Sequence, residues 1–123
     1  MSKPTSEVRA LAFSVTRKFG INKCYECAVE LRRIMISAGK SGCVLKLKSR
    51  GERGYVVMKD PGFKLPFATQ DNEAIATSGQ HFGVQVGSFV FDNVHREGIP
   101  RSEWQDTFDC DVHTFELTEI DQF

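Results

Sequence analysis

The chain has 123 residues, a length that suits one domain with one hydrophobic core, so we treat residues 1–123 as a single domain. Its sixteen basic residues balance its sixteen acidic ones without any basic block, and the composition therefore gives no reason to expect a nucleic-acid partner. An apolar content of 41%, with ten Phe, indicates a folded domain, and no apolar run approaches the length of a membrane span, so no membrane partner is expected.

The cysteines and the N-terminus bear on the compartment. Residues 1–4 contain no apolar signal-peptide segment. Four cysteines, at positions 24, 27, 43 and 110, are too few for a disulfide framework. We therefore expect reduced thiols and a cytoplasmic site of action. The alternative is a domain cut from a larger exported protein and delivered with it.

The first forty residues predict two helices. Residues 5–18 carry an apolar stripe at helical spacing, with Thr5 or Ser6 as the N-cap. A second helix is predicted from residue 24 to residue 38, and Gly39 ends it. Its apolar face recurs at helical spacing, and its solvated face consists of Glu26, Glu30, Arg32 and Arg33.

Strands follow the helices. Residues 43–48 alternate apolar and basic side chains, which is typical of a half-buried strand, and residues 55–58 predict a second strand. Residues 59–79 are interrupted by Pro and Gly and predict a long loop with one short helical turn at 73–76. A loop this long in a compact domain is often functional.

The clearest hairpin joins residues 81–86 to residues 87–92. If Val86-Gly87 forms a two-residue turn, Phe82 pairs with Phe91 on the core face. Val84 then pairs with Phe89 on that face, while His81 meets Asp92 on the opposite face, where Gly83 leaves open space. Beyond the hairpin we expect a turn-rich segment at 93–100, a short helix at 101–108 with Trp104 as a core anchor, and a last strand at 112–117.

Cys24 is the candidate nucleophile. It lies at the start of the second helix, where unpaired backbone N–H groups and the positive end of the helix dipole favour a thiolate. The His81–Asp92 pair supplies a base and the carboxylate that orients it. Cys27 lies one turn further into the helix and is interpreted as a packing residue. The pattern predicts a Cys–His–Asp triad.

Three segments of the chain resemble the papain fold toxin domains of bacterial polymorphic toxin systems, of the papain fold toxin 2 type. The resemblance covers roughly residues 5–108 and depends on the order Cys, His, Asp and on the motifs around them. These motifs are Lys23-Cys24-Tyr25-Glu26-Cys27-Ala28, Gly79-Gln80-His81-Phe82-Gly83-Val84, and Val90-Phe91-Asp92-Asn93-Val94-His95-Arg96-Glu97-Gly98-Ile99-Pro100 with Trp104 after it.

The resemblance implies a papain-like α+β fold, with the N-terminal helices packed on a small antiparallel sheet. It implies a cysteine hydrolase that acts on protein amide bonds without a cofactor, either as a peptidase or as a glutamine deamidase. It also implies a toxic effector that an immunity protein neutralises. Papain carries a Cys-x-x-Cys in which the second cysteine acts, so Cys27 remains the alternative nucleophile.

The sequence departs from the papain-like pattern at the oxyanion hole. Papain-like proteases carry a glutamine a few residues before the nucleophile, and none precedes Cys24 here. Asn22 is the nearest amide, and the backbone N–H groups of Cys24 and Tyr25 at the helix start are further candidates. Gln80, next to His81, is another polar candidate for substrate binding.

Two other classes of function compete with the hydrolase. A zinc-stabilised binding module would use Cys24, Cys27, Cys110 and His113 as metal ligands, although the two pairs are far apart in the sequence. A non-catalytic module with a papain-like shell leaves the His81–Asp92 pair without a purpose. A thioredoxin-like redox site is disfavoured because Cys24 follows a helix and a turn instead of a strand.

Overall fold

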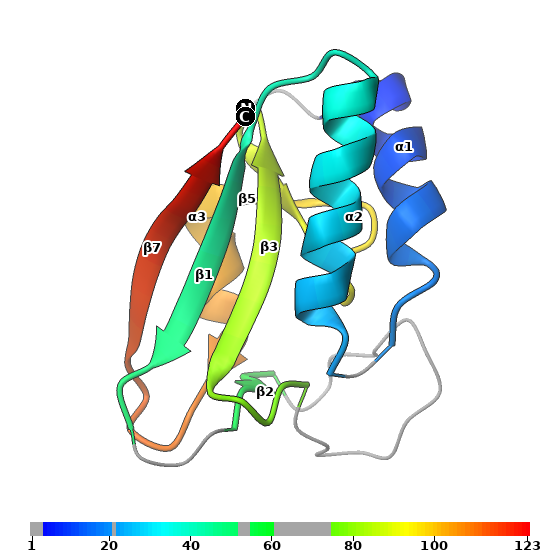
Figure 1. Cartoon of the computed structure of the whole chain (residues 1–123). Coiled ribbons are helices and arrows are strands. Elements are labelled where there is room, and N and C mark those ends of the chain that lie inside the picture. The colour runs from blue at the N-terminus through cyan, green and yellow to red at the C-terminus, as the bar shows by residue number, and fades with distance from the viewer. Residues whose placement is uncertain (1–3, 21, 52–54, 61–74) are drawn as a thin grey trace.

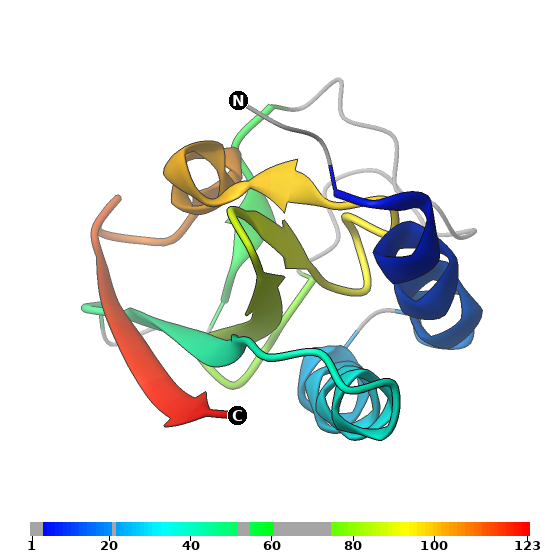
Figure 2. The same ribbon diagram turned by 90° about the horizontal axis from the view of Figure 1, so that it is seen from above.

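The computed structural model describes residues 4–20, 22–51, 55–60 and 75–123. Two helices come first and are followed by an antiparallel five-stranded sheet in the order β5-β4-β3-β1-β7. Figures 1 and 2 show a curved sheet with the N-terminal helices on one side and the short helix α3 on the other. The predicted α+β fold is therefore confirmed.

The elements have the following bounds. The helices are α1 (Ser6–Thr16), α2 (Cys24–Ser37), α3 (Arg101–Trp104) and a 3-10 turn η1 (Gln105–Thr107). The main sheet contains β1 (Cys43–Ser49), β3 (Gln80–Val86), β4 (Phe89–Phe91), β5 (Ile99–Pro100) and β7 (Phe115–Gln122). A separate two-stranded sheet pairs β2 (Val57–Met58) with β6 (Phe108–Asp109).

Local sequence signals explain both long helices. The Thr5 hydroxyl accepts a hydrogen bond from the Val8 N–H at 3.2 Å, which caps α1 as predicted. Helix α2 begins at Cys24 as predicted, and Gly39 follows it with a positive φ of 73°. The apolar stripe of α2 is buried, with Leu31 and Met35 fully enclosed. On the solvated face, Glu30 pairs with Arg33.

The predicted register of the hairpin was wrong by two residues. The turn is centred on Gly87-Ser88, so that Val84 pairs with Phe91 and Val86 with Phe89. Gly87 has a φ of 63°, which glycine adopts without strain and which two-residue hairpin turns require. A shift of two residues keeps every side chain on its face, because side chains alternate along a strand.

Several other boundaries also differ from the prediction. The last strand begins at residue 115 and not at 112, and β5 and β6 were not expected. Residues 61–74 of the predicted long loop lie outside the described residues. Ile75 and Ala76 are not helical, because Val56 and Ala76 form an antiparallel bridge. The short helix is confirmed as α3 with η1, and Trp104 is fully buried, as predicted for a core anchor.

Candidate active site

Cys24 occupies the first position of α2, and its side chain is 5% exposed. The N-cap residue, Lys23, offers no side-chain acceptor to the first turn. The N–H groups at the start of a helix have no acceptor within the helix. The helix therefore presents its positive end beside the Cys24 sulfur, which lies 3.9 Å from the carbonyl oxygen of Gln80 on β3.

His81 and Asp92 form a buried pair. The Nε2 atom of His81 lies 2.9 Å from Oδ2 of Asp92, and both side chains have no exposed surface. The predicted direct opposition of these residues in the hairpin does not occur, because β4 ends at Phe91. The two side chains still meet, because β4 runs antiparallel to β3 and Asp92, which follows β4 directly, therefore lies near the start of β3.

The surroundings of His81 raise its pKa to about 9. Burial alone lowers it, but the hydrogen bond to Asp92 and the neighbouring Cys24 sulfur both stabilise the imidazolium and outweigh that cost. Among the described residues, no hydrogen bond of standard length and angle ends on Nδ1. Nδ1 is therefore the nitrogen available to exchange a proton with Cys24.

The carboxylate of Asp92 is surrounded by donors. Its Oδ1 accepts the backbone N–H groups of Val94 at 2.9 Å and His95 at 2.6 Å, and lies 3.1 Å from Nδ1 of His95. Its Oδ2 accepts from His81 and from Nε1 of Trp104, the latter at 2.7 Å. Burial opposes the charged form, but the two histidines overcome it and hold the pKa of Asp92 well below its ordinary value.

The space beside His81 is filled, which corrects the prediction that Gly83 leaves it open. A Cβ added at Gly83 would lie 2.8 Å from Cζ2 of Trp104 and 2.7 Å from Cγ1 of Val90. The missing side chain lets the indole pack directly against β3. The face that carries His81 is therefore a second core face, and Phe108 closes it with a ring 4.5 Å from the His81 imidazole.

Cys27 has the environment of a neutral thiol. It is fully buried, and burial raises its pKa far above the ordinary value, with the negative charge of Asp92 adding to the effect. A thiol held in its protonated form is a poor nucleophile. Between the two cysteines of α2, these surroundings favour Cys24 for the chemistry and Cys27 for packing.

The three residues predicted for oxyanion or substrate binding lie around Cys24. Asn22 has a positive φ of 61°, and its Oδ1 accepts the Thr77 N–H at 3.0 Å, which ties this turn to the segment before β3. Tyr25 is 55% exposed and packs edge-on against Phe82, with ring centroids 5.1 Å apart. Gln80 contributes its backbone carbonyl to the surroundings of the Cys24 sulfur.

The structure does not assemble the proposed zinc ligands. His113 pairs with Asp109 at 2.8 Å on the surface, and the Cys110 thiol donates to the Thr114 carbonyl at 3.1 Å. Within the described ranges, which include Cys24, Cys27, Cys110 and His113, no group of three or more His, Cys, Asp or Glu side chains is placed to hold a metal ion. The zinc interpretation was therefore wrong about these four residues.

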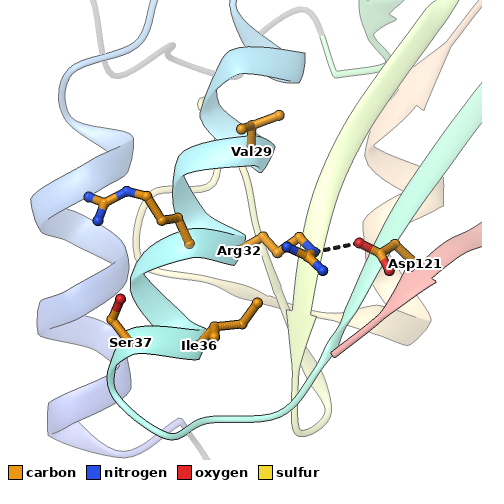
Figure 3. Close-up of a pocket in the computed structure, with 6 residues that line it drawn as sticks. Val29, Arg32, Ile36, Ser37 and Asp121 are labelled. Atoms are coloured by element: carbon orange, nitrogen blue, oxygen red, sulfur yellow. Dashed lines mark ion pairs between the residues drawn. The ribbon is translucent and has the colours of Figure 1, made fainter.

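A shallow groove runs along the exposed side of α2. Val29 and Ile36, both about half exposed, form its apolar part, and Arg32 reaches across to Asp121 on β7 (Figure 3). The groove has a volume of about 520 Å³, and Arg33 and Ser37 complete its lining. It begins one turn beyond Cys24 on the same helix.

Sequence reasoning missed the side chains that hold the loop after β4 in place. Asn93 is fully buried, and its Nδ2 donates to the Gly20 carbonyl at 2.8 Å. Arg96 donates to the Phe19 carbonyl at 3.0 Å. Both contacts join the Asp92 loop to the turn that leads into Cys24. The polar residues that follow the apolar strand directly were the available sequence signal for this loop. They did not indicate which residues Asn93 and Arg96 would contact.

No helix in the described part of the chain is long and apolar enough to cross a membrane. Comparison with curated proteins and with solved structures found no match. A scan of family models matched residues 7–109 to the family described as papain fold toxin 2, and this range includes Cys24, His81 and Asp92. Because the match covers most of the sequence, the chain belongs to the papain fold toxin 2 family.

Proposed function

We propose that this chain is a cysteine-dependent amidohydrolase in which Cys24 is the nucleophile, His81 the general base and acid, and Asp92 the residue that orients His81. The observation that carries the proposal is the buried His81–Asp92 pair, with Nε2 of His81 2.9 Å from Oδ2, beside the sulfur at the start of α2. Membership of a papain-fold toxin family supports the same reaction class.

The hydrogen bonds assign the proton on neutral His81. An ionised carboxylate only accepts hydrogen bonds, so the proton of the neutral imidazole lies on Nε2, which faces Asp92. This leaves a lone pair on Nδ1 to take the Cys24 proton. Asp92 then stabilises the imidazolium that forms, as the orienting carboxylate does in a Ser–His–Asp triad.

The reaction balances with these groups and water. Nδ1 of His81 takes the thiol proton, and Sγ of Cys24 attacks the carboxamide carbon. The tetrahedral intermediate collapses when the imidazolium gives its proton to the leaving nitrogen, which departs as an amine or as ammonia. Water, deprotonated by His81, then attacks the thioester, and the imidazolium returns this proton to the departing Cys24 sulfur. The product is a carboxylic acid, which ionises in solvent.

The start of α2 is the proposed oxyanion site. Backbone N–H groups of Cys24 and Tyr25 lie at the positive end of the helix, and Lys23 does not cap them with a side chain. Asn22 immediately precedes this turn, with its Oδ1 bound to Thr77. We assign its Nδ2 as a further donor to the developing oxyanion.

The proposed biological role is that of a toxin that acts on a protein in the cytoplasm of a rival cell and that an immunity protein neutralises in the producer. The reaction is either peptide cleavage or glutamine deamidation. The test is expression of wild type and of Cys24→Ala in bacteria, followed by mass spectrometry of the proteome. Growth arrest that requires Cys24, together with new protein termini or glutamine-to-glutamate mass changes in the proteome, identifies the reaction.

Iodoacetamide labelling across pH, read by peptide mass spectrometry, tests the site without a substrate. The chain supplies its own controls, because Cys43 and Cys110 are also buried, with 9% and 6% exposure against 5% for Cys24. We expect fast labelling of Cys24 below pH 8 that His81→Ala abolishes. Slow labelling of all four cysteines with similar pH profiles would contradict the proposal and favour a non-catalytic binding module.

A further inference from the structure

The Asp92 carboxylate contacts two histidines, of which the proposed triad uses one. Nδ1 of His95 lies 3.1 Å from Oδ1 and 3.3 Å from Oδ2 of Asp92, while His81 contacts Oδ2 from β3. His95 follows Asp92 by three residues in the loop after β4, and its side chain is 6% exposed. The mechanism above gives this second imidazole no task.

The orientation of a carboxylate requires external donors, because the terminal torsion of an Asp side chain has a broad energy minimum. The backbone N–H groups of Val94 and His95 donate to Oδ1 of Asp92 and not to Oδ2. The His95 imidazole is close to both oxygens and therefore restricts rotation of the carboxylate plane. Trp104 also donates to Oδ2.

One aromatic ring holds both imidazoles. The Phe108 ring lies 4.5 Å from the His81 ring and 5.5 Å from the His95 ring, the latter in an edge-to-face arrangement at 85°. His95 also forms part of a surface depression of about 460 Å³ lined by Phe13, Val94, His95, Arg96, Glu97 and Gly98. His95 thus lies between the buried Asp92 and the protein surface.

We propose that His95 is a positioning residue for the candidate triad: the N–H at its Nδ1 holds the Asp92 carboxylate in the orientation that presents Oδ2 to His81. This inference rests on the proposed function. Because an oriented Asp92 sustains the imidazolium of His81, loss of the His95 donor weakens the base and slows the reaction of Cys24.

Other ionisable groups near Asp92 limit what a pH profile reports. His81 faces Asp92 from β3. On α2, Cys24 interacts electrostatically with His81, and Cys27 with Asp92. Arg96 belongs to the same loop as His95 and interacts electrostatically with Cys27. Variants must therefore be compared at equal charge. His95→Asn and His95→Gln are both uncharged amides, but Asn places its NH₂ group near the position of Nδ1, whereas Gln extends it toward the position of Nε2.

The experiment measures the rate of Cys24 alkylation against pH in wild type, His95→Asn, His95→Gln and His95→Leu, with the pKa of His81 followed by NMR. We expect Gln and Leu to slow alkylation about tenfold or more, the loss expected for one hydrogen bond to a charged group. We also expect both to lower the pKa of His81, because Asp92 no longer keeps the orientation that presents Oδ2 to the imidazolium. Asn should recover most of the rate. Circular dichroism checks the fold of each variant.

Two results would overturn the inference. One is that Cys24 is alkylated as fast in all folded variants as in wild type. The other is that alkylation is as slow in His95→Asn as in His95→Gln, which would assign the effect to the shape or charge of the His95 side chain and not to the donor at Nδ1. If Leu does not fold, the Asn and Gln pair decides. A wild-type Cys24 without fast, His81-dependent alkylation refutes the proposed function itself, which is a distinct outcome because it needs no His95 variant.

Discussion

Gly83 lies directly beneath the indole of Trp104, so that a Cβ at residue 83 would lie 2.8 Å from Cζ2 of the ring. The same indole donates its Nε1–H to Oδ2 of Asp92 at 2.7 Å. The Trp104 ring packs closely on β3 because Gly83 has no side chain. This packing sets the position of a hydrogen-bond donor in the candidate active site.

Substitution Gly83→Ala should destabilise the protein and disturb the site together. The added methyl contacts Trp104 and Val90 at distances that force one of them to move, and overpacking of this kind costs about 1–3 kcal/mol. We expect a lower urea midpoint and slower alkylation of Cys24. Gly20→Ala is the matched control, because a Cβ there meets nothing within 4 Å. Equal stability of the two variants would contradict the packing described here.

Substitution Trp104→Phe should weaken the Asp92 site while keeping an aromatic ring in the core. It removes the Nε1–H that donates to Oδ2, and a hydrogen bond to a charged group contributes about 1.5–3 kcal/mol. The free energy of unfolding, measured in urea, should fall by at least that amount. Tyr55→Phe, at a side chain that is 54% exposed, should change it by less than about 0.5 kcal/mol. A neutral Trp104→Phe would show that Asp92 does not depend on the indole.

The two cysteines of α2 should separate function from stability. Cys24→Ala should abolish growth inhibition because it removes the proposed nucleophile, and we expect a small change in stability because the sulfur's hydrogen bond to the Gln80 carbonyl is long, at 3.9 Å. Cys27→Ala should remain toxic but lose about 1 kcal/mol, since its fully buried side chain leaves a small cavity. The reverse pattern, in which Cys27→Ala is inactive and Cys24→Ala remains toxic, would make Cys27 the nucleophile.

The raised pKa of His81 predicts a stability that falls on the alkaline side. The folded protein holds this imidazolium with a pKa of about 9, against an ordinary value of 6.5. Its contribution is therefore complete below pH 6.5 and is lost as pH rises through about 9. Hydrolysis should decline over the same upper range, because the leaving nitrogen requires the proton of the imidazolium.

Urea unfolding of wild type and His81→Gln between pH 6 and pH 10 measures the contribution of the His81 imidazolium to the free energy of unfolding. The glutamine does not titrate in this range, so its stability should depend less on pH than that of wild type. The difference between the two proteins should shrink toward the alkaline end. A constant difference across the range would mean that His81 does not titrate with a raised pKa in the folded state.

Sequence alone predicted those features that depend on neighbouring residues. The Thr5 cap, the start of α2 at Cys24 and its end before Gly39 follow from local hydrogen bonding and helical spacing. The hairpin was also found, but its register was wrong by two residues, because Gly87 permits a turn at either position. The choice between these two turn positions depends on how Phe91 and Phe89 fit the core, which is a property of the folded sheet.

The order Cys24, His81, Asp92 was therefore determined by the sequence, together with the helix start that holds the cysteine. Only the tertiary structure decided that Asp92 lies buried beyond the end of β4, where His95 and Trp104 also contact it. These contacts join residues from separate elements across a second core face. Local periodicity carries no information about them, because a side chain's partners across the core depend on how strands and helices pack.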